Sequence, residues 1–397
     1  MKIKRVFKKY YNKAASRIYK FATLKVIYPF VYNLYKRKPI DDKKVLLIEV
    51  RSLTLTDSYA VLDRELKARG DLKISYQYLG ETIVGVLGCL KRGLACVKEL
   101  ATARAAFITD ACQITSCVNL RKETKLIQIW HACGAFKKFG FSTALLKFGD
   151  SEKRMLKYPY YKNISYITVS SPEVVWAYEQ AMNSSRFKSK VVPVGVSRTD
   201  LFFDNVFVNS AKERIYEAFP NARNKKVILY APTFRGKVRS ARTGMVDIDR
   251  FYHELSDEYV LIIKHHPYVK NPPIIDEEYK DFAADLSKTC DIEDLLCTAD
   301  ICISDYSSLV FEYSLFERPL IFFAYDIESY NDWRGFYYDY DELTPGPVFM
   351  TDEEIIDYIK NIDQRFDRER VSEFKDKFMS SCDGNATNRI IDLAVGE

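Results

Sequence analysis

Short apolar runs rich in β-branched residues recur along the chain, and longer polar or amphipathic stretches separate most of them. Runs of this length suit buried strands, and the stretches between them are long enough for helices. Apolar strands that alternate with helices predict parallel sheets covered on both faces. The expected strands lie at 45–50, 74–79, 105–109, 126–130, 166–170, 191–194, 227–231, 259–264, 301–304 and 320–323.

The runs form two sets, divided near residues 204–223. A chain of 397 residues is also too long for one ordinary core. We therefore predict two doubly wound, Rossmann-like α/β domains that face each other across a cleft, at 41–210 and 211–397. In open parallel sheets, ligands bind beyond the carboxyl ends of the strands. The residues that directly follow each strand are thus the place to seek chemistry.

The first forty residues differ from the rest in charge. They contain twelve Lys or Arg and no Asp or Glu and therefore carry +12, more than the whole net charge of +6, while the rest of the chain is close to balanced with a small excess of acids. Aromatic and aliphatic residues are interleaved with these bases. This pattern predicts a basic amphipathic helix at 1–40, broken at Pro29, that lies on an anionic membrane surface. The alternative is an ordinary surface helix packed on the enzyme. No further basic, aromatic-rich patch suggests a nucleic-acid partner.

Other signals exclude several classes of protein. No apolar run is long enough to span a membrane and no secretory signal is evident, so we expect a peripheral protein at the cytoplasmic face. The nine scattered cysteines form no Cys-x-x-Cys pair, which favours reduced thiols. The chain lacks a phosphate-binding P-loop, a Gly-x-Gly-x-x-Gly motif after a strand, a nucleophile elbow and metal-ligand spacing. These absences argue against an ATPase, a dehydrogenase and an α/β-hydrolase.

Three of the four histidines lie at or beyond strand ends. His131 follows the run at 126–130 in the first predicted domain, and His265 and His266 follow the run at 259–264 in the second. Two such positions, one in each domain, would face each other across the cleft. We therefore expect functional roles for His131 and His266, with His265 as a further candidate.

Hydroxyl groups follow a strand of the second set. Residues 304–308 read Ser-Asp-Tyr-Ser-Ser and lead into a helical pattern, so Ser307 and Ser308 would present hydroxyls and backbone N–H groups to an anion. The alternative for Ser307 is a simple helix N-cap, worth about 1 kcal/mol. Asp305 and Glu312 are candidates to orient a ribose or an incoming hydroxyl.

Cationic side chains complete the set. Arg198, Arg235 and Arg334 each lie near a glycine in a turn, where a guanidinium can approach phosphate closely. Solvated surface arginine is the usual alternative. Strand ends rich in hydroxyls, Arg, Lys and His, with few carboxylates, predict a site for a phosphate-bearing ligand.

Seven motifs in a fixed order carry a family resemblance. They are Trp-His at 130–131 with Lys-Lys-Phe-Gly at 137–140, Gly-Val-Ser-Arg-Thr-Asp at 195–200, Tyr-Ala-Pro-Thr-Phe-Arg at 230–235, Lys-His-His-Pro at 264–267, Ser-Asp-Tyr-Ser-Ser at 304–308, Arg-Gly-Phe at 334–336 and Asp-Gly-Asn-Ala at 383–386. Together they resemble the CDP-glycerol glycerophosphotransferases of teichoic-acid and capsule synthesis. The match runs from about residue 126 to 388, and earlier residues match only in general character.

The resemblance implies a GT-B-like fold and a reaction. A polyol phosphate, glycerol phosphate in the first instance, would pass from CDP-glycerol or CDP-ribitol to a hydroxyl of an undecaprenyl-diphosphate-linked glycan acceptor, and CMP would leave. His131 would be the general base, and His266 would stabilise charge on the donor phosphates or assist the leaving group. The expected donor-binding residues are Arg198, Arg235, Lys264, Asp305, Ser307, Ser308, Glu312 and Arg334.

Several alternatives remain open at this point. The chemistry requires no cofactor, and a divalent cation is optional. Many family members have glycine directly after the histidine, where this chain has Ala132-Cys133-Gly134, so the acceptor is not identified. A nucleotide-sugar glycosyltransferase of the same architecture is the main rival. A non-catalytic module that binds the membrane surface is the third interpretation.

Overall fold

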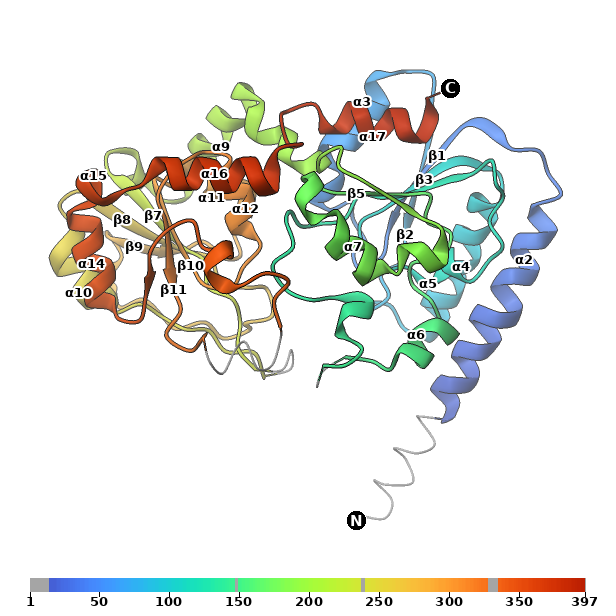
Figure 1. The fold of residues 1–397 in the computed structure, drawn as a ribbon, viewed down its shortest axis with the longest axis horizontal. Helices are drawn as coiled ribbons and strands as arrows, with labels where there is room; N and C mark the ends of the chain where they lie inside the picture. Colours follow the sequence, from blue (N-terminus) through green and yellow to red (C-terminus); the bar gives the residue numbers. More distant parts are fainter. Residues whose placement is uncertain (1–13, 147–148, 237–239, 328–334, 397) are drawn as a thin grey trace, which may run out of the picture.

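Two six-stranded sheets organise the computed structural model, which describes residues 14–146, 149–236, 240–327 and 335–396 (Figure 1). All of the described strand pairs are parallel. Alternate residues of a strand are buried in different cores: Leu46 and Ile48 in one, Val45 and Leu47 in another. Burial on both faces explains why the strands are nearly continuous apolar runs.

The first sheet has the order β2-β1-β3-β4-β5-β6, and the second has the order β12-β11-β10-β7-β8-β9. We call the unit around each sheet the first lobe and the second lobe. The first sheet consists of β1 (Asp41–Glu49), β2 (Lys73–Tyr78), β3 (Ala103–Ile108), β4 (Lys125–Gln128), β5 (Tyr166–Thr168) and β6 (Lys190–Val192). The second consists of β7 (Lys226–Tyr230), β8 (Tyr259–Ile263), β9 (Ala283–Asp285), β10 (Ile301–Ser304), β11 (Leu320–Phe323) and β12 (Val348–Phe349).

Helices connect successive strands. In the first lobe they are α2 (Tyr28–Tyr35), α3 (Ala60–Ala68), α4 (Val86–Leu100), α5 (Gln113–Ser116), α6 (Glu152–Lys157), α7 (Val175–Met182), α8 (Ser184–Phe187) and the 3₁₀ segments η3 (Gly140–Thr143) and η5 (Ser197–Phe203). In the remainder they are α9 (Asn205–Ala218), α10 (Ile248–Leu255), α11 (Ile292–Thr298), α12 (Leu309–Ser314), α14 (Asp352–Lys360), α15 (Ile362–Arg365), α16 (Arg368–Met379) and α17 (Ala386–Val395).

Each of the ten predicted runs contains a strand, so the two-sheet α/β architecture is confirmed. The sequence did not predict β9 and β12, which are three and two residues long. Both are outermost strands of the second sheet, where few ladder hydrogen bonds suffice to extend it.

The connection between the lobes is less simple than a single boundary. The predicted boundary between residues 210 and 211 lies inside α9. The chain then returns, because α17 at its C-terminal end packs on the first sheet (Figure 1). Ile390, Ile391 and Ala394 share a buried core with Val45 and Leu47 of β1. The last helix therefore belongs to the first lobe, not to the second as the contiguous division predicts.

The N-terminal helix is not broken at Pro29, contrary to the prediction. Residues 14–21 are helical, and the helix continues through a π-helical turn (η1, Ala22–Ile27) into α2. Pro29 lacks an N–H group, and its ring would clash with a carbonyl in a regular helix. The wider turn before it, in which the Tyr28 N–H donates to the Thr23 carbonyl, accommodates the ring. No helix in the described ranges is long and apolar enough to cross a membrane.

Two glycines with positive φ provide a test of close packing in the first lobe. Gly140 has φ +53°, and an added Cβ would lie 2.1 Å from the Ala181 carbonyl oxygen of α7, whereas Gly70 has φ +73° and open space. Gly70→Ala should lower the free energy of unfolding by about 1–2 kcal/mol through backbone strain alone. Gly140→Ala should cost about 1–3 kcal/mol more, because η3 must separate from α7. Urea unfolding of both variants measures this, and equal losses would contradict it.

Candidate functional site

A cavity of about 420 Å³ lies between the lobes. Residues that follow β4 line it from the first lobe, and residues that follow β7, β8 and β10 line it from the second. Because β7 and β10 are neighbours from which the chain proceeds in opposite directions, their carboxyl ends form a switch point, the usual ligand site in open parallel sheets. The lining residues include Trp130, Ala132, Cys133, Lys137, Phe139, Tyr178, Thr233, Phe234, His266, Tyr268, Ser307 and Ser308.

His131 has a defined tautomer. Its Nδ1 lies 2.7 Å from the backbone carbonyl oxygen of Thr109. A carbonyl oxygen can only accept a hydrogen bond, so Nδ1 carries the proton and the neutral ring has its lone pair on Nε2. Trp130 and Ala132, on either side of His131, line the cavity, and the His131 side chain itself is exposed.

The surroundings favour the neutral form of this ring. Although the residue is exposed in part, protein atoms around the ring desolvate it and lower the pKa of His131 below its ordinary value of 6.5, while Asp110 and the Thr109 carbonyl oppose the shift. Arg51 and Arg198 lower the pKa further. A neutral imidazole with an unprotonated Nε2 is the form that a general base requires.

The turn before His131 is strained. Trp130 has φ +55°, which is rare for a residue with a large side chain. The indole ring of Trp130 stacks between the rings of His131 and Phe139, whose centroids lie 4.4 and 4.9 Å away. The backbone N–H of Trp130 donates to Gln128 Oε1 at 3.1 Å. These contacts hold the backbone in the conformation that turns His131 out of the strand.

His266 has the opposite arrangement. Its Nδ1 accepts a hydrogen bond of 3.2 Å from the Tyr268 N–H, so in the neutral ring the proton lies on Nε2. The ring packs between Phe234 and Tyr268, each 4.7 Å away. One histidine thus offers a lone pair and the other offers a proton.

His265 is buried and donates its backbone N–H to Ser287, so it supports the strand end and does not line the cavity.

Ser307 and Ser308 line the cavity, as the sequence predicts for a phosphate site. The alternative role of Ser307 as the helix N-cap is wrong, because the N-cap of α12 is Ser308; the Ser307 Oγ accepts the Leu309 N–H at 3.4 Å. Their contact with a donor stays a prediction.

Three other predicted donor-binding residues have internal partners. Arg235 forms ion pairs with Asp326 and, at 2.9 Å, with Asp305, whose carboxylate also accepts the Thr233 N–H and hydroxyl. Lys264 Nζ donates to backbone carbonyl oxygens, including that of Ser287 at 3.0 Å. Arg235, Asp305 and Lys264 therefore shape the carboxyl edge of the second sheet and are absent from the cavity lining.

Arg198 and Glu312, also expected at the donor, instead join the lobes. Arg198, on η5, forms ion pairs with Glu293 of α11 at 2.5 Å and Glu312 of α12 at 3.1 Å, and all three side chains are buried. Burial alone would lower the pKa of Arg198, but the two carboxylates raise it above its ordinary value. Arg198 Nη1 also donates to the His131 carbonyl oxygen at 3.2 Å. This buried triad ties the His131 loop to the second lobe.

Arg334 lies outside the described residues, but the segment after it is informative. Lys137 of the first lobe and Phe336 of the second form an antiparallel bridge, in which the Lys138 N–H donates to the Gly335 carbonyl oxygen at 3.1 Å. The ring of Phe336 packs on Phe136 at 5.4 Å. The segment at 335–337 thus holds Phe136 and Lys137, which line the cavity.

Sequence reasoning did not include Lys137 among the site residues, although its motif at 137–140 was noted. It is the lysine in the cavity lining, whereas its neighbour Lys138 is not. Phe234 and Tyr268, which hold His266, were also missed, and nothing in the sequence pairs them. No group of three or more His, Cys, Asp or Glu side chains among the described residues could hold a metal ion.

Comparison with known proteins identifies the family. Residues 30–396 match the family described as CDP-Glycerol:Poly(glycerophosphate) glycerophosphotransferase. The chain belongs to this family. The resemblance found at residues 126–388 is therefore confirmed, and the expectation that earlier residues match only in general character is wrong, because the family match begins at residue 30.

Named relatives of the family include polymerases and primases. The teichoic acid poly(ribitol-phosphate) polymerase of Bacillus spizizenii is 34% identical over 93% of this chain, and the chain spans 59% of that relative's length. The teichoic acid ribitol-phosphate primase of the same organism is 31% identical, over 89% of this chain and 91% of the relative. The teichoic acid glycerol-phosphate primase of Bacillus subtilis is 33% identical, over 70% of each chain.

A solved structure confirms the predicted GT-B-like fold of this family member. The wall teichoic acid polymerase TagF superposes with a TM-score of 0.74 at 21% identity, over 98% of this chain and 96% of that chain.

The interlobe triad predicts a pH dependence of stability. Burial raises the pKa of Glu312 from its ordinary 4.5 to about 7, against the opposing effect of Arg198. Because the folded state holds this proton more tightly than the unfolded state, the contribution is complete below pH 4.5 and is lost as the pH rises through about 7. Glu312→Gln cannot ionise. The free energy of unfolding of the wild type, relative to this variant, should therefore fall between pH 4.5 and 7.

Denaturant unfolding at several pH values measures this difference. Glu373→Gln, at an exposed position of α16, is the control and should follow the wild type. Parallel pH profiles for the wild type and Glu312→Gln would show that Glu312 titrates normally.

Proposed function

We propose that this chain transfers a polyol phosphate from a CDP-polyol to a hydroxyl of a lipid-linked acceptor and releases CMP. The observation that carries the proposal is the pair of histidines with opposite tautomers, one beside and one in the same interlobe cavity. Family membership supports the substrate class. A TagF crystal was soaked with CDPG, which supports a cytidine diphosphate donor for this fold.

In the proposed reaction, the acceptor oxygen attacks the β-phosphorus of the donor. The new P–O bond forms as the bond from that phosphorus to the bridging oxygen breaks, and CMP leaves with the bond's electrons. His131 Nε2 takes the proton of the acceptor hydroxyl, and His266 Nε2–H donates to the donor phosphates or to the leaving group. Positioning and charge neutralisation account for most of the catalysis in such transfers.

The chemical identity of the donor substrate distinguishes this proposal from the two alternatives, a nucleotide-sugar glycosyltransferase and a non-catalytic binding module. Relatives named for ribitol phosphate and relatives named for glycerol phosphate are 30–35% identical to this chain, so both polyols are tested. Purified protein with an acceptor-bearing membrane fraction is offered CDP-glycerol, CDP-ribitol and several UDP-sugars. Release of CMP with a CDP-polyol supports the proposal. UDP release would favour a glycosyltransferase, and no release with any donor would favour a binding module.

Removal of the base should affect turnover more than donor binding. His131→Ala should lower kcat by about 10²–10⁴-fold and leave the affinity for the CDP-polyol within a few-fold. The wild-type kcat/KM should rise with an apparent pKa below 6.5, since His131 must be neutral. His253→Ala, at an exposed position of α10, is the control. Turnover by His131→Ala close to that of the wild type would refute the assignment.

Lys137 should contact the donor phosphates, because among the residues that the structure describes it is the Lys or Arg in the cavity lining. A hydrogen bond from a charged donor contributes about 1.5–3 kcal/mol, so Lys137→Ala should raise the KM for the CDP-polyol by about tenfold or more. Lys138→Ala, one residue along the same bridge, should change the KM less than threefold. Equal effects of the two substitutions would assign both lysines to the loop structure alone.

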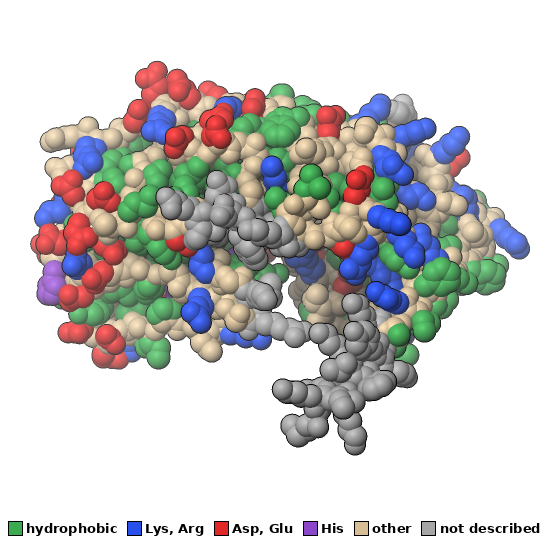
Figure 2. All heavy atoms as spheres, turned by 60° about the horizontal axis from the view of Figure 1, so that its bottom comes forward, with side chains coloured by type: hydrophobic (Ala, Val, Ile, Leu, Met, Phe, Trp, Pro, Cys, Tyr) green, Lys and Arg blue, Asp and Glu red, His purple; other side chains and the backbone are tan. Residues whose placement is uncertain are grey.

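We further propose that the N-terminal helix binds an anionic membrane surface at the cytoplasmic face. One side of the helix packs on α4 through Tyr28 and Tyr32, while Ile18, Phe21 and Phe30 are more than half exposed. Lys and Arg gather over the first lobe on the face shown in Figure 2, and Asp and Glu over the outer part of the second. A Phe21→Ser/Phe30→Ser variant should bind phosphatidylglycerol vesicles at least fivefold more weakly in sedimentation. Unchanged binding would leave this helix as a packing element only.

A further inference from the structure

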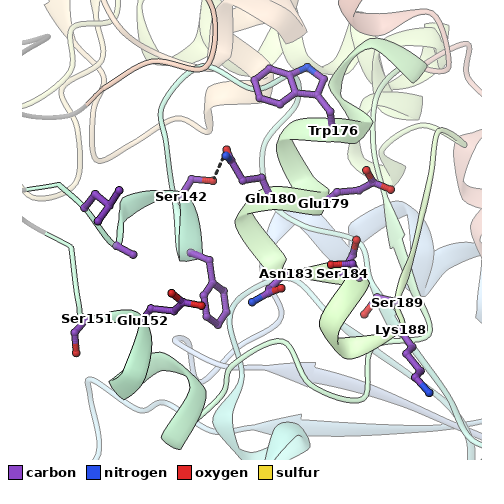
Figure 3. A pocket seen from close by; sticks show the side chains of 14 residues that line it. Ser142, Ser151, Glu152, Trp176, Glu179, Gln180, Asn183, Ser184, Lys188 and Ser189 are labelled. Carbon is purple, nitrogen blue, oxygen red and sulfur yellow. Dashed lines mark hydrogen bonds between the residues drawn. The ribbon is translucent and has the colours of Figure 1, made fainter.

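A second hollow lies on the first lobe, apart from the cavity with the histidines. Its volume is about 1040 Å³, and η3, α6, α7, α8 and the segments that adjoin them line it (Figure 3). We call it the first-lobe groove. The proposed reaction gives this groove no role so far, because none of its lining residues lines the interlobe cavity.

The chemistry of the groove is polar but poor in positive charge. Among the residues that the structure describes, half of the fourteen in the lining carry a hydroxyl or an amide: five serines, Gln180 and Asn183. The charged members of this described lining are Glu152, Glu179 and Lys188, two acids and one base. Phosphate groups are bound best by clustered cations, and the described lining supplies one lysine beside two carboxylates. Hydroxyls, amides and carboxylates instead match the mixed donors and acceptors of uncharged sugars.

Trp176 provides an aromatic surface at one end of the groove (Figure 3). Trp176 is 43% exposed, yet contacts with two tyrosines fix the position of its ring. The indole Nε1–H donates to the Tyr338 hydroxyl at 2.9 Å, and its ring meets Tyr337 and Tyr338 edge-on at 5.5 Å. A large apolar side chain held exposed beside polar groups is a typical feature of sites that bind ligands with both apolar and hydroxylated faces.

The groove adjoins the catalytic cavity through shared elements. On α7, Trp176 and Gln180 face the groove, while Tyr178 lines the interlobe cavity. Ser142 donates to Gln180 Oε1 at 3.1 Å in the groove and accepts a hydrogen bond from Tyr337 at 2.8 Å. Tyr337 also packs edge-on against Phe139, which lines the interlobe cavity, with ring centroids 6.1 Å apart. Contacts through Tyr337 therefore link the two sites.

The other end of the groove lies toward the N-terminal helix. Glu152 of α6 lines the groove, and Tyr158, directly after α6, lies 4.9 Å from Lys20 Nζ of that helix. Leu145, also in the lining, is fully exposed. The groove thus extends between the proposed membrane-binding helix and the site of phosphoryl transfer.

From this placement and this lining, we infer that the first-lobe groove binds an uncharged sugar unit of the acceptor, and that Trp176 packs against the sugar ring. The inference rests on the proposed function, since an acceptor anchored in a membrane must pass from the N-terminal helix to His131. It assigns the groove to the acceptor glycan and not to the nucleotide or to a polyol-phosphate chain.

Direct binding tests the inference without turnover. Full-length protein is titrated calorimetrically with N,N′-diacetylchitobiose and other neutral disaccharides, with an oligo(glycerol phosphate), and with CDP-glycerol and CDP-ribitol. At least one neutral disaccharide should bind, and Trp176→Ala and Glu179→Lys should each weaken that binding at least tenfold. Both variants should bind the CDP-polyol as the wild type does. Trp176→Phe, which loses the hydrogen bond to Tyr338 but keeps a ring, should retain most of the affinity.

Glu373→Lys, an equally exposed helical glutamate on the second lobe, is the matched control and should bind as the wild type. In turnover assays, the groove variants should raise the KM for the acceptor at least fivefold with little change in the KM for the donor. Absence of disaccharide binding, equal binding by the groove variants and the wild type, or binding of the oligo(glycerol phosphate) in the groove would overturn the inference. Disaccharide binding without CMP release would uphold it and refute the donor assignment alone.

Discussion

The arrangement of the two lobes depends on one buried guanidinium. Arg198 lies on η5, between β6 of the first sheet and α9. Its guanidinium extends to the second lobe, where it pairs with Glu293 and Glu312. Removing one partner from such a cluster leaves an unpaired buried charge, which costs about 3–5 kcal/mol. The same guanidinium donates to the His131 backbone. A contact that joins the lobes therefore also holds the backbone of the proposed base.

Much of the architecture can be predicted from the sequence because parallel strands buried on both faces have an unmistakable composition. The runs at 227–231 and 259–264 are almost wholly apolar, and polar residues, Thr233 and Lys264, lie at or shortly after their ends, at the edge where ligands bind. The shortest strands could not be predicted, since three residues at Ala283–Asp285 have no periodicity to read. Nor could the continuous helix through Pro29, because proline ordinarily breaks or kinks a regular helix and nothing in the sequence signals the π-helical turn that accommodates it.

The candidate site likewise contains residues that the sequence predicts and residues whose roles only the structure reveals. His266 and the paired serines line the cavity as predicted, and His131 lies between two lining residues, because a position after a strand is a local property of the sequence. Arginine roles are not local. The sequence around Arg198 or Arg235 shows a turn and a charge, but the partners that neutralise each guanidinium lie about 70–115 residues away. The tautomers of the two histidines depend equally on distant or turn-specific backbone groups, and only the folded structure fixes them.

The return of α17 to the first sheet has a consequence for biosynthesis. Ile390, Ile391 and Ala394 complete the core on one face of β1, so that face stays partly uncovered until residues 386–395 have left the ribosome. The lobe that is made first is thus the one that is completed last, and the usual sequence of independent, N-terminal-first domain folding does not apply. Premature termination before residue 386 would expose an apolar sheet surface and leave a nascent chain prone to aggregation, even with the second lobe almost complete.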